Sequence, residues 1–192
     1  MSTSTLIVTG AGGHLGRRVI ELLLAKPTGA RIIATTRAPE KLADLAARGV
    51  EVRAADFDRP ETLAAAFAGG DRLLLISTDV VGQGDRRLNQ HRNAVTAAQS
   101  AGIQHVVYTS LVNPEPGTPI TLAPDHHGTE QALAASTLDW TVLRNNVYAE
   151  SLLGSLPRAV ATGQWMAAAG DGRTAFVTRE DCARAAAAAL DA

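Results

Sequence analysis

Short apolar runs alternate five times with segments of helical periodicity, and this alternation limits the possible folds more than any other feature of the sequence. The apolar runs lie at Thr5–Thr9, Arg31–Thr36, Val50–Ala54, Arg72–Ile76 and Ile103–Thr109. The helical segments that follow the first four are Leu15–Ala25, Pro39–Arg48, Pro60–Gly69 and Arg86–Ala101. Alternating strands and helices predict an α/β fold in which a doubly wound parallel sheet carries helices on both faces.

The chain changes character after Ser110. Prolines and a glycine between Asn113 and Pro124 predict a loop. The remaining expected elements are a helix at Thr129–Ala135, a strand at Trp140–Leu143, a partly helical stretch at Leu152–Thr162 and a helix at Arg179–Leu190. With 192 residues, of which 46% are hydrophobic and 19% charged, the sequence is the right size for one globular domain, residues 1–192.

A glycine-rich turn joins the first strand to the first helix. Its spacing is Gly10-x-x-Gly13-x-x-Gly16, with Gly12 as an extra glycine and Leu15 where the third glycine of the usual fingerprint would stand. Glycines at such a turn allow a tight bend and a close approach to pyrophosphate, and the helix start offers free N–H groups. We expect a dinucleotide-binding loop, against the alternative of a simple connector. A P-loop is excluded because neither lysine follows a glycine.

The end of the second strand indicates which nucleotide is bound. An NAD site carries a carboxylate there, whereas this strand ends in Thr36-Arg37. A guanidinium can bind a 2′-phosphate in a bidentate way, so Arg37 predicts NADP(H), with Lys41 or Arg17 as second cation. The alternative is that Arg37 is simply solvated. Asp56 is a candidate for the adenine side, or else a turn or helix-capping residue.

Composition excludes several other classes of function. The net charge of −1 argues against a nucleic-acid partner, and no apolar run approaches the length of a membrane span. Cys182 is the only cysteine, so the sequence holds no disulfide and no cysteine metal cluster. The N-terminal residues show no secretory signal, and we expect a cytoplasmic protein without a metal.

The residues available for catalysis are also few. The only tyrosines, Tyr108 and Tyr148, lack a lysine four residues later, so the catalytic pair of short-chain dehydrogenases is absent. Ser110 lacks the flanking glycines of a nucleophile elbow, and the adjacent His126 and His127 do not suit a metal site. What remains is hydride transfer in which the cofactor supplies the chemistry. A conjugated acceptor such as a quinone suits this because its reduced anion needs no strong acid.

A set of linked motifs resembles the NmrA-like branch of the atypical short-chain dehydrogenases. The match is strongest to bacterial flavin-free NAD(P)H:quinone oxidoreductases, with triphenylmethane reductases as near relatives. The motifs span most of the chain: Leu73–Thr78, Gln90–Asn93, Tyr108–Leu111, His126–Glu130, Leu143–Tyr148 and Ala168–Gly172. The resemblance implies a Rossmann fold and NADPH as cofactor, with neither flavin nor metal.

The resemblance also implies roles for individual residues. The cofactor loop would comprise Gly10, Gly12, Gly13, His14, Leu15 and Gly16, with Arg37 on the 2′-phosphate. Ile76, Ser77 and Thr78 would line the nicotinamide-side ribose, and Thr109 and Ser110 would approach the nicotinamide. Asn145, Asn146 and Tyr148 would border the acceptor pocket, so that residues 111–192 contribute its acceptor side. Members of that family usually continue past the equivalent of Leu190 into a small lobe over this pocket, and we expect this lobe to be short or missing here.

Several of these residues have plainer interpretations. Tyr148 can equally be a core aromatic. His126 is a candidate proton donor, but a solvated or capping histidine is the plainer alternative, and it is also spaced to pair with Glu130. Gln90, His91 and Asn93 are expected to be structural or interface groups, and Cys182 a small buried residue. The Arg86–Ala101 helix offers a face for a homodimer.

Two hypotheses of function follow. The first is an NADPH-dependent oxidoreductase that transfers a hydride to a quinone or similar small conjugated acceptor, with Tyr148, Asn145 and His126 as candidate catalytic residues. The second is a non-catalytic NADP(H)-binding redox sensor that acts through a protein partner. The missing tyrosine–lysine pair favours the sensor, and the Leu143–Tyr148 motif favours the enzyme.

Overall fold

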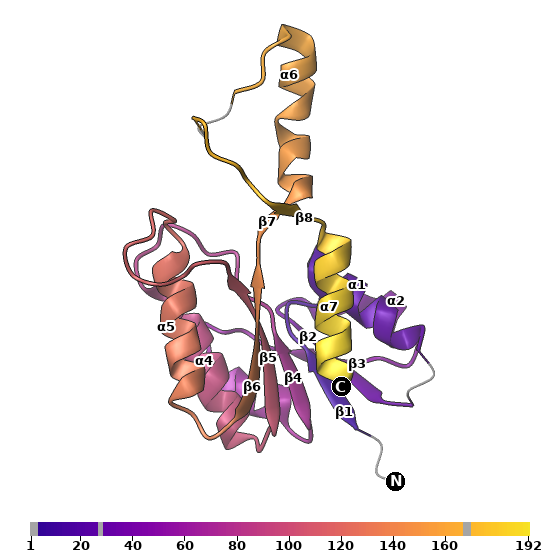
Figure 1. Ribbon diagram of the computed structural model, residues 1–192. Helices are drawn as coiled ribbons and strands as arrows, with labels where there is room; N and C mark the ends of the chain where they lie inside the picture. Colours follow the sequence, from indigo (N-terminus) through magenta and orange to yellow (C-terminus); the bar gives the residue numbers. More distant parts are fainter. Residues whose placement is uncertain (1–3, 27–28, 167–169) are drawn as a thin grey trace.

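A six-stranded parallel sheet forms the centre of the computed structural model, which describes residues 4–26, 29–166 and 170–192 (Figure 1). The strand order is β3-β2-β1-β4-β5-β6, and every neighbouring pair is parallel. The strands are β1 (Thr5–Val8), β2 (Arg31–Thr36), β3 (Glu51–Ala54), β4 (Arg72–Leu75), β5 (His105–Leu111) and β6 (Asp139–Asn145). The chain winds outward from β1 to β3 and then back past β1 to β4, which confirms the predicted doubly wound α/β fold.

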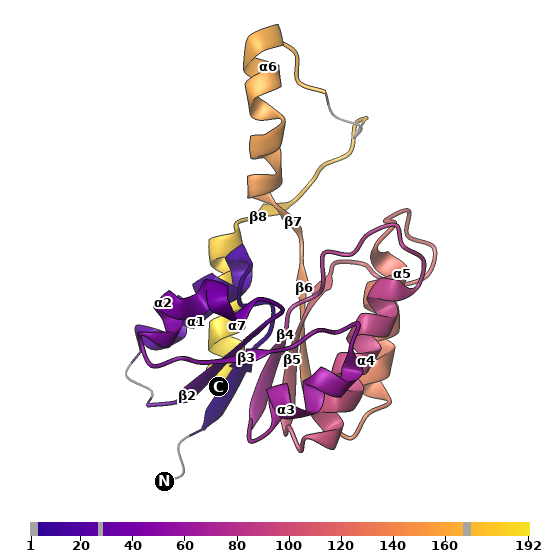
Figure 2. The same ribbon diagram turned by 180° about the vertical axis from the view of Figure 1, so that it is seen from behind.

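Helices cover both faces of the sheet, as Figures 1 and 2 show from opposite sides. One face carries α1 (His14–Leu24), α2 (Ala43–Ala46) and α7 (Arg179–Asp191), and the other carries α3 (Leu63–Phe67), α4 (Arg86–Ser100) and α5 (Ala123–Ala134). Successive side chains of a strand point to opposite faces. In β1, Leu6 and Val8 join one buried cluster, and Ile7 joins the other. Because both faces are buried in the middle of the sheet, the central strands β1 and β4 consist mainly of apolar residues.

Helix α7 returns from the end of the chain to pack beside α1. Its buried face consists mostly of small residues, which permit close packing against the first helix: Cys182, Ala183, Ala186, Ala187 and Leu190. The Thr178 hydroxyl caps the helix by accepting from the Asp181 N–H at 3.0 Å. Arg18 of α1 donates to both oxygens of Glu180, at 2.6 and 2.9 Å. The prediction that Cys182 is a small buried residue is confirmed.

Some predicted element boundaries were wrong. The expected helix at Pro39–Arg48 is a 3-10 turn η1 (Pro39–Leu42) followed by the single turn of α2, and Pro60 likewise opens a 3-10 turn η2 (Pro60–Thr62) before α3. Helix α5 begins at Ala123, well before the expected Thr129. Its Pro124 lies in the first turn, where a proline costs no intrahelical hydrogen bond.

Residues 147–166 and 170–177 form an arm that projects from the edge of the sheet at which the strands end (Figures 1 and 2). It is built from β7 (Val147–Tyr148), a 3-10 helix η3 (Ala149–Gly154), α6 (Leu156–Thr162) and β8 (Phe176–Val177), and β7 pairs in parallel with β8. Most of the exposed large hydrophobic side chains of the described residues belong to the arm: Val147, Leu153, Leu156, Val160, Trp165, Met166 and Phe176.

The packing of α1 against the end of β1 depends on one glycine. A Cβ atom added to Gly16 would lie 2.5 Å from the carbonyl oxygen of Gly10 and 3.0 Å from the Ala11 Cα. Both are backbone atoms, so neither can move aside as a flexible side chain would. Gly10 itself has a φ of 60°, which suits glycine. The helix approaches the strand end this closely only because Gly16 has no side chain.

We therefore expect Gly16→Ala to destabilise the fold. Overpacking against backbone typically costs about 1–3 kcal/mol, more than the ~1 kcal/mol that alanine gains over glycine inside a helix. Urea unfolding followed by circular dichroism would measure the loss. Gly12→Ala is the matched control, because its added Cβ meets only the Thr36 hydroxyl, at 3.4 Å. Equal stability of the two variants would contradict this account of the α1 packing.

Candidate functional site

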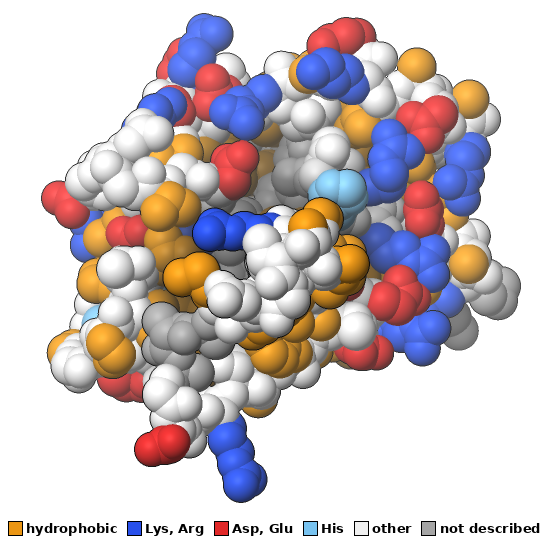
Figure 3. Space-filling model, turned by 90° about the horizontal axis from the view of Figure 1, so that it is seen from above, with side chains coloured by type: hydrophobic (Ala, Val, Ile, Leu, Met, Phe, Trp, Pro, Cys, Tyr) orange, Lys and Arg blue, Asp and Glu red, His pale blue; other side chains and the backbone are white. Residues whose placement is uncertain are grey.

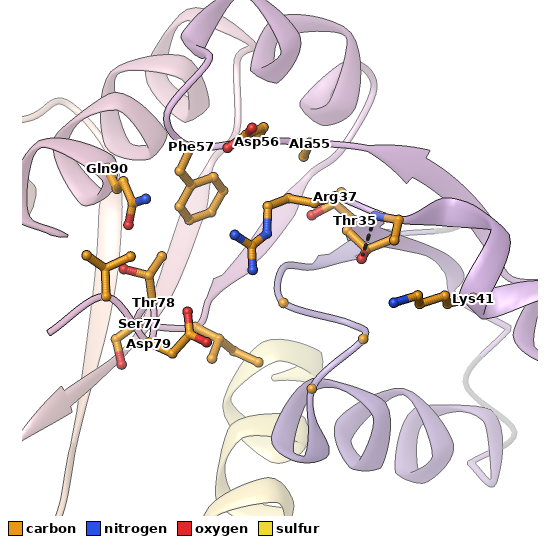
Figure 4. A pocket seen from close by; sticks show the side chains of 17 residues that line it. Thr35, Arg37, Lys41, Ala55, Asp56, Phe57, Ser77, Thr78, Asp79 and Gln90 are labelled. Carbon is orange, nitrogen blue, oxygen red and sulfur yellow. Dashed lines mark hydrogen bonds between the residues drawn. The ribbon is translucent and has the colours of Figure 1, made fainter. Parts of the chain in front are cut away.

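A cavity of about 460 Å³ opens at the carboxyl ends of β1 to β4, beside the glycine-rich turn (Figure 4). In an open parallel sheet this edge, at the point where the strand order reverses, is where ligands bind. The lining residues come from the turn, the segments after β2, β3 and β4, and one side chain of α4: Gly10, Gly12, Gly13, Thr35, Thr36, Arg37, Ala38, Lys41, Ala55, Asp56, Phe57, Ile76, Ser77, Thr78, Asp79, Val80 and Gln90.

The glycine turn leaves its backbone open towards the cavity. The Gly13 N–H donates to the Gly10 carbonyl at 2.9 Å, and the Ala11 N–H donates to the Thr35 carbonyl at 3.1 Å, which fixes the loop against β2. Gly13 is also the N-cap of α1 and provides no side-chain cap. The first N–H groups of a helix have no intrahelical partner, so this helix start can bind an anionic group.

Two cationic side chains lie at the other end of the cavity, after β2. Arg37 projects into it (Figure 4) and makes no hydrogen bond or ion pair with the described residues, and Lys41 lines the same end. Arg17, the other predicted cation, is engaged elsewhere, because it donates to both carboxylate oxygens of Asp44 at 2.5 and 3.2 Å. The end of β2 therefore offers an uncommitted guanidinium and no carboxylate.

The segment after β3 forms a second wall. Asp56 lines the cavity, but its Oδ1 also accepts from the Asp58 N–H at 3.0 Å, so it acts as a turn residue too. Phe57 presents its ring between Arg37 and Gln90 in Figure 4. The Arg86 guanidinium, which donates to both oxygens of Asp58, holds the pKa of that carboxyl below its usual range.

Buried side chains hold the backbone of residues 76–78 after β4 has ended. The Ile76 N–H donates to the Thr9 hydroxyl at 2.9 Å, the Ser77 N–H to the Thr109 hydroxyl at 2.9 Å, and the Thr78 N–H to His91 Nε2 at 3.0 Å. Arg87 Nε donates to the Thr78 carbonyl at 2.8 Å. Thr109 thus acts behind the cavity wall, and residues of β5 and α4 fix a wall segment that has no strand partner.

The hydrogen bonds of His91 and His126 define their tautomers. A backbone N–H faces Nε2 of His91, and the Arg87 guanidinium faces Nε2 of His126 at 3.1 Å, so both Nε2 atoms must accept. Their Nδ1–H groups then donate, His91 to Thr129 at 2.9 Å and His126 to the Tyr108 hydroxyl at 2.8 Å. Burial, with the nearby charge of Arg87, lowers the pKa of each histidine to about 3.

The expectation that His126 is solvated or capping was therefore wrong, since it is only 4% exposed. It does not line the cavity, and its only ring N–H is committed to Tyr108, so the structure gives no support to His126 as a proton donor. Glu130 pairs instead with Arg144, whose Nη2 lies 2.6 Å from its Oε2. Gly128 of α5 packs against the end of the Leu88 side chain of α4, from which an added Cβ would lie 2.9 Å. His126 is buried against Arg87 of α4 and Tyr108 of β5.

The remaining predicted site residues lie outside the lining of this cavity. His14, Leu15 and Gly16 begin α1, behind the turn. Ser110 and Asn145 lie at the carboxyl ends of β5 and β6, and Asn146 and Tyr148 follow β6. Ser110 donates to Glu130 at 2.6 Å, and Asn145 donates to the Tyr148 hydroxyl at 3.3 Å. Burial raises the pKa of Tyr148. Ala168 and Ala169 of the Ala168–Gly172 motif lie outside the described residues.

Sequence reasoning missed several lining residues. Ala55, Phe57 and Asp79 follow strand ends, a position that the general rule for parallel sheets would have indicated. Gln90 was expected to be structural or part of an interface, yet it lines the cavity from α4. His91 and Asn93 are structural, as expected, since Asn93 donates to the Phe57 carbonyl at 2.9 Å.

No three or more His, Cys, Asp or Glu side chains of the described residues are grouped so as to hold a metal ion. Within the same residues, no helix has the length and apolar character that crossing a bilayer requires. Seen from the side of the arm, the charged side chains lie mainly around the rim and hydrophobic ones gather towards the centre (Figure 3).

The doubly wound sheet, the glycine turn at the uncapped start of α1 and the cavity beside it define a dinucleotide-binding protein. Comparison with known proteins agrees with this class. Residues 10–192 match the family model described as NAD(P)H-binding, and the chain belongs to that family.

Among curated proteins, the chain is 44% identical to quinone oxidoreductase 2 of Escherichia coli K12 over 95% of its own length and 62% of that protein. Two solved structures resemble it closely. The Citrobacter sp. triphenylmethane reductase complexed with NADP(H) superposes with a TM-score of 0.90 at 39% identity, over 98% of this chain and 66% of that one. The E. coli NADPH-dependent quinone oxidoreductase complexed with NADPH superposes with a TM-score of 0.89 at 44% identity, over 97% of this chain and 64% of that one. The chain thus spans less than two thirds of the length of these relatives.

The neutral state of the two buried histidines leads to a prediction about stability. Both bind protons in the unfolded chain below about pH 6.5 but in the folded protein only near pH 3. The contribution of the two neutral histidines to the free energy of unfolding should therefore be fully present above pH 6.5. It should fall as the pH falls, by up to about 1.4 kcal/mol per pH unit for each histidine. Urea unfolding at pH 7, 6 and 5 measures this slope before most carboxylates titrate.

The variant His126→Asn should be less stable at pH 7 but should show a shallower slope between pH 7 and 5. His127→Asn, which changes the adjacent residue outside this network, is the control and should keep the slope of the unmodified protein. An unchanged slope in His126→Asn would show that His126 is not held neutral in the fold.

Proposed function

We propose that the cavity binds NADP(H) and that the chain serves an NADPH-dependent oxidoreductase that passes a hydride to a quinone or similar conjugated acceptor. The observation that carries this proposal is the uncommitted guanidinium of Arg37, at a strand end without a carboxylate. A guanidinium in this position can donate two hydrogen bonds to a 2′-phosphate. An NAD site would instead carry an acidic residue here to accept from the 2′-hydroxyl. Lys41 lies close enough to the same end to add a second positive charge.

The cavity fits a dinucleotide in other respects. The glycine turn and the uncapped start of α1 offer N–H groups to the pyrophosphate, and a side chain at Gly12 or Gly13 would narrow that space. Two buried side-chain oxygens on the cavity wall, Thr35 Oγ1 and Gln90 Oε1, have no hydrogen-bond partner within the described residues. Buried polar atoms normally have partners, so a polar ligand is expected there.

The protein's own contribution to such a reaction is positioning. NADPH, when bound, supplies the hydride. The hydroxyls of Thr9 and Thr109, together with His91 and Arg87, hold residues 76–78 rigidly, and we assign Ile76, Ser77 and Thr78 to the nicotinamide-side ribose. A wall fixed by buried side chains keeps a ligand in one orientation without reorganisation, which favours transfer between aligned groups.

We assign the acceptor side to the ends of β5 and β6. Asn145 and Tyr148 are hydrogen-bonded to each other. The Arg179 guanidinium lies over the Tyr148 ring, with its Cζ 5.3 Å from the centroid of the ring. Burial raises the pKa of the Tyr148 phenol, so it remains protonated at neutral pH and can only be a weak donor. That suffices for a quinone, whose reduced anion is stabilised by conjugation. The matching activities of the related quinone and triphenylmethane reductases support this class of acceptor.

Replacement of Arg37 tests the cofactor assignment. Loss of charge-assisted hydrogen bonds to a phosphate typically weakens binding about 10- to 100-fold. Arg37→Ala should therefore raise the Kd for NADPH by roughly that factor and leave the Kd for NADH almost unchanged, as measured by fluorescence titration. Arg48→Ala removes an exposed arginine outside the cavity and is the matched control. Equal losses for both dinucleotides in Arg37→Ala would refute the 2′-phosphate assignment.

Oxidation of NADPH and NADH by the purified chain, with and without simple quinones, tests the reaction itself. We expect quinone-dependent consumption that is faster with NADPH. Tyr148→Phe, which removes the hydroxyl but keeps the ring, should lower kcat if this edge borders the acceptor. Tight NADPH binding without turnover would contradict the reductase proposal for this chain and would favour the redox-sensor alternative.

A further inference from the structure

Strand β6 ends the sheet on one side, and its outer edge is uncovered. Among the described residues no strand pairs with this edge, and Figure 1 shows β6 in front of the other strands, between α5 and α7. The opposite edge strand, β3, has only four residues, of which Glu51 and Arg53 are charged. Short length and charge protect the edge of a sheet, so β3 is better protected than the seven-residue β6.

The backbone groups of alternate β6 residues point away from the sheet. The Asp139 N–H donates to the Gln104 carbonyl at 3.0 Å, and the Asn145 carbonyl accepts from the Val112 N–H at 3.2 Å. The odd-numbered residues of β6 are therefore bonded towards β5. In a parallel pair, the residues between them direct both their N–H and their C=O groups to the other side. The outward-directed residues of β6 are Trp140, Val142 and Arg144.

The side chains of these three residues share one face of the sheet. Val142 packs against the buried cluster that α3, α4 and α5 cover, and Arg144 pairs with Glu130 of α5 and with Glu115. Trp140, which follows the same alternation, is 45% exposed. A neighbouring strand would cover the tryptophan and bond the outward backbone groups at the same time.

An antiparallel second copy of β6 matches this edge in one register. When Val142 lies opposite its own copy, all seven residues overlap, and each outward residue lies opposite another outward residue. Trp140 then faces Arg144 of the second copy, which pairs an aromatic ring with a guanidinium. Asp139 faces Asn145, so no charged residue lies opposite a like charge. The strand is thus complementary to itself.

We propose that β6 is the interaction surface for a second copy of this chain, whose own β6 pairs with it antiparallel and extends the sheet across a twofold axis at Val142. The two arms then project from opposite ends of the paired strands and do not meet. Helix α4, the face that the sequence suggested for a homodimer, is a weaker candidate because Gln90, His91 and Asn93 are bonded within the chain. The cavity is lined by residues 10–90, so this inference is independent of the proposed function.

Sedimentation velocity of the unmodified chain from about 1 to 500 µM measures the association, over a range that suits a small interface. We expect a species of twice the 20.0 kDa mass of the chain. Trp140→Lys places two cations opposite each other at both ends of the paired strands and should raise the dimer Kd about 10-fold or more. Trp165→Lys, which replaces a tryptophan of the arm that is 49% exposed, is the matched control and should keep the Kd of the unmodified chain.

Hydrogen exchange of the unmodified chain is the second measurement and needs no variant. The amides of Trp140, Val142 and Arg144 should exchange more slowly at high than at low chain concentration, whereas those of β3 should not change. A chain that stays monomeric over the whole range, or that forms larger assemblies, would overturn the inference. So would a dimer that Trp140→Lys leaves intact, that Trp165→Lys dissociates equally, or in which these three amides stay unprotected.

Discussion

The close contact between Gly16 and the Gly10 carbonyl is the constraint on which the rest of the site depends. It brings the first turn of α1 against the end of β1, at a separation that no Cβ would permit. Only then do the loop N–H groups and the helix start lie at the same edge as the ends of β2, β3 and β4. The position of the cavity thus depends on this backbone packing, and the polar side chains that line it come from the neighbouring strand ends.

A second constraint keeps this cavity in one shape. After Leu75 the fourth strand loses its partners, and side chains take over the backbone hydrogen bonds of the next three residues. Two of those side chains, Arg87 and His91, lie one turn apart on α4, and Gln90 lies between them. The same helix therefore fixes the wall after β4 through Arg87 and His91 and lines the cavity with Gln90.

Much of this could be predicted from the sequence because it rests on local rules. The alternation of strands and helices predicts the sheet, and the glycine spacing with Arg37 predicts the two ends of the cavity. What failed depends on tertiary packing. The spacing of His126 and Glu130 suggests a surface pair, but α5 packs against α4 and buries His126 beside Arg87 and Tyr108. Gln90 contacts Asp58, and His91 contacts Thr78. The partners of each pair belong to different elements, so the sequence alone does not show that they meet.

The sequence specifies the arm and the proposed acceptor side less fully than the cavity beside the glycine turn. The chain spans less than two thirds of the quinone and triphenylmethane reductases compared above, and the described cavity is lined by residues 10–90 alone. The part of the site that the sequence specifies most fully is therefore the cofactor-binding half, which the glycine turn, Arg37 and α4 define together.

The most direct test of the central claim is a crystal structure of this chain with NADP⁺. The account predicts the pyrophosphate against the Gly10–Gly13 turn and the 2′-phosphate within hydrogen-bond distance of the Arg37 guanidinium. A dinucleotide bound elsewhere, or bound here with its 2′-phosphate directed away from Arg37, would contradict it.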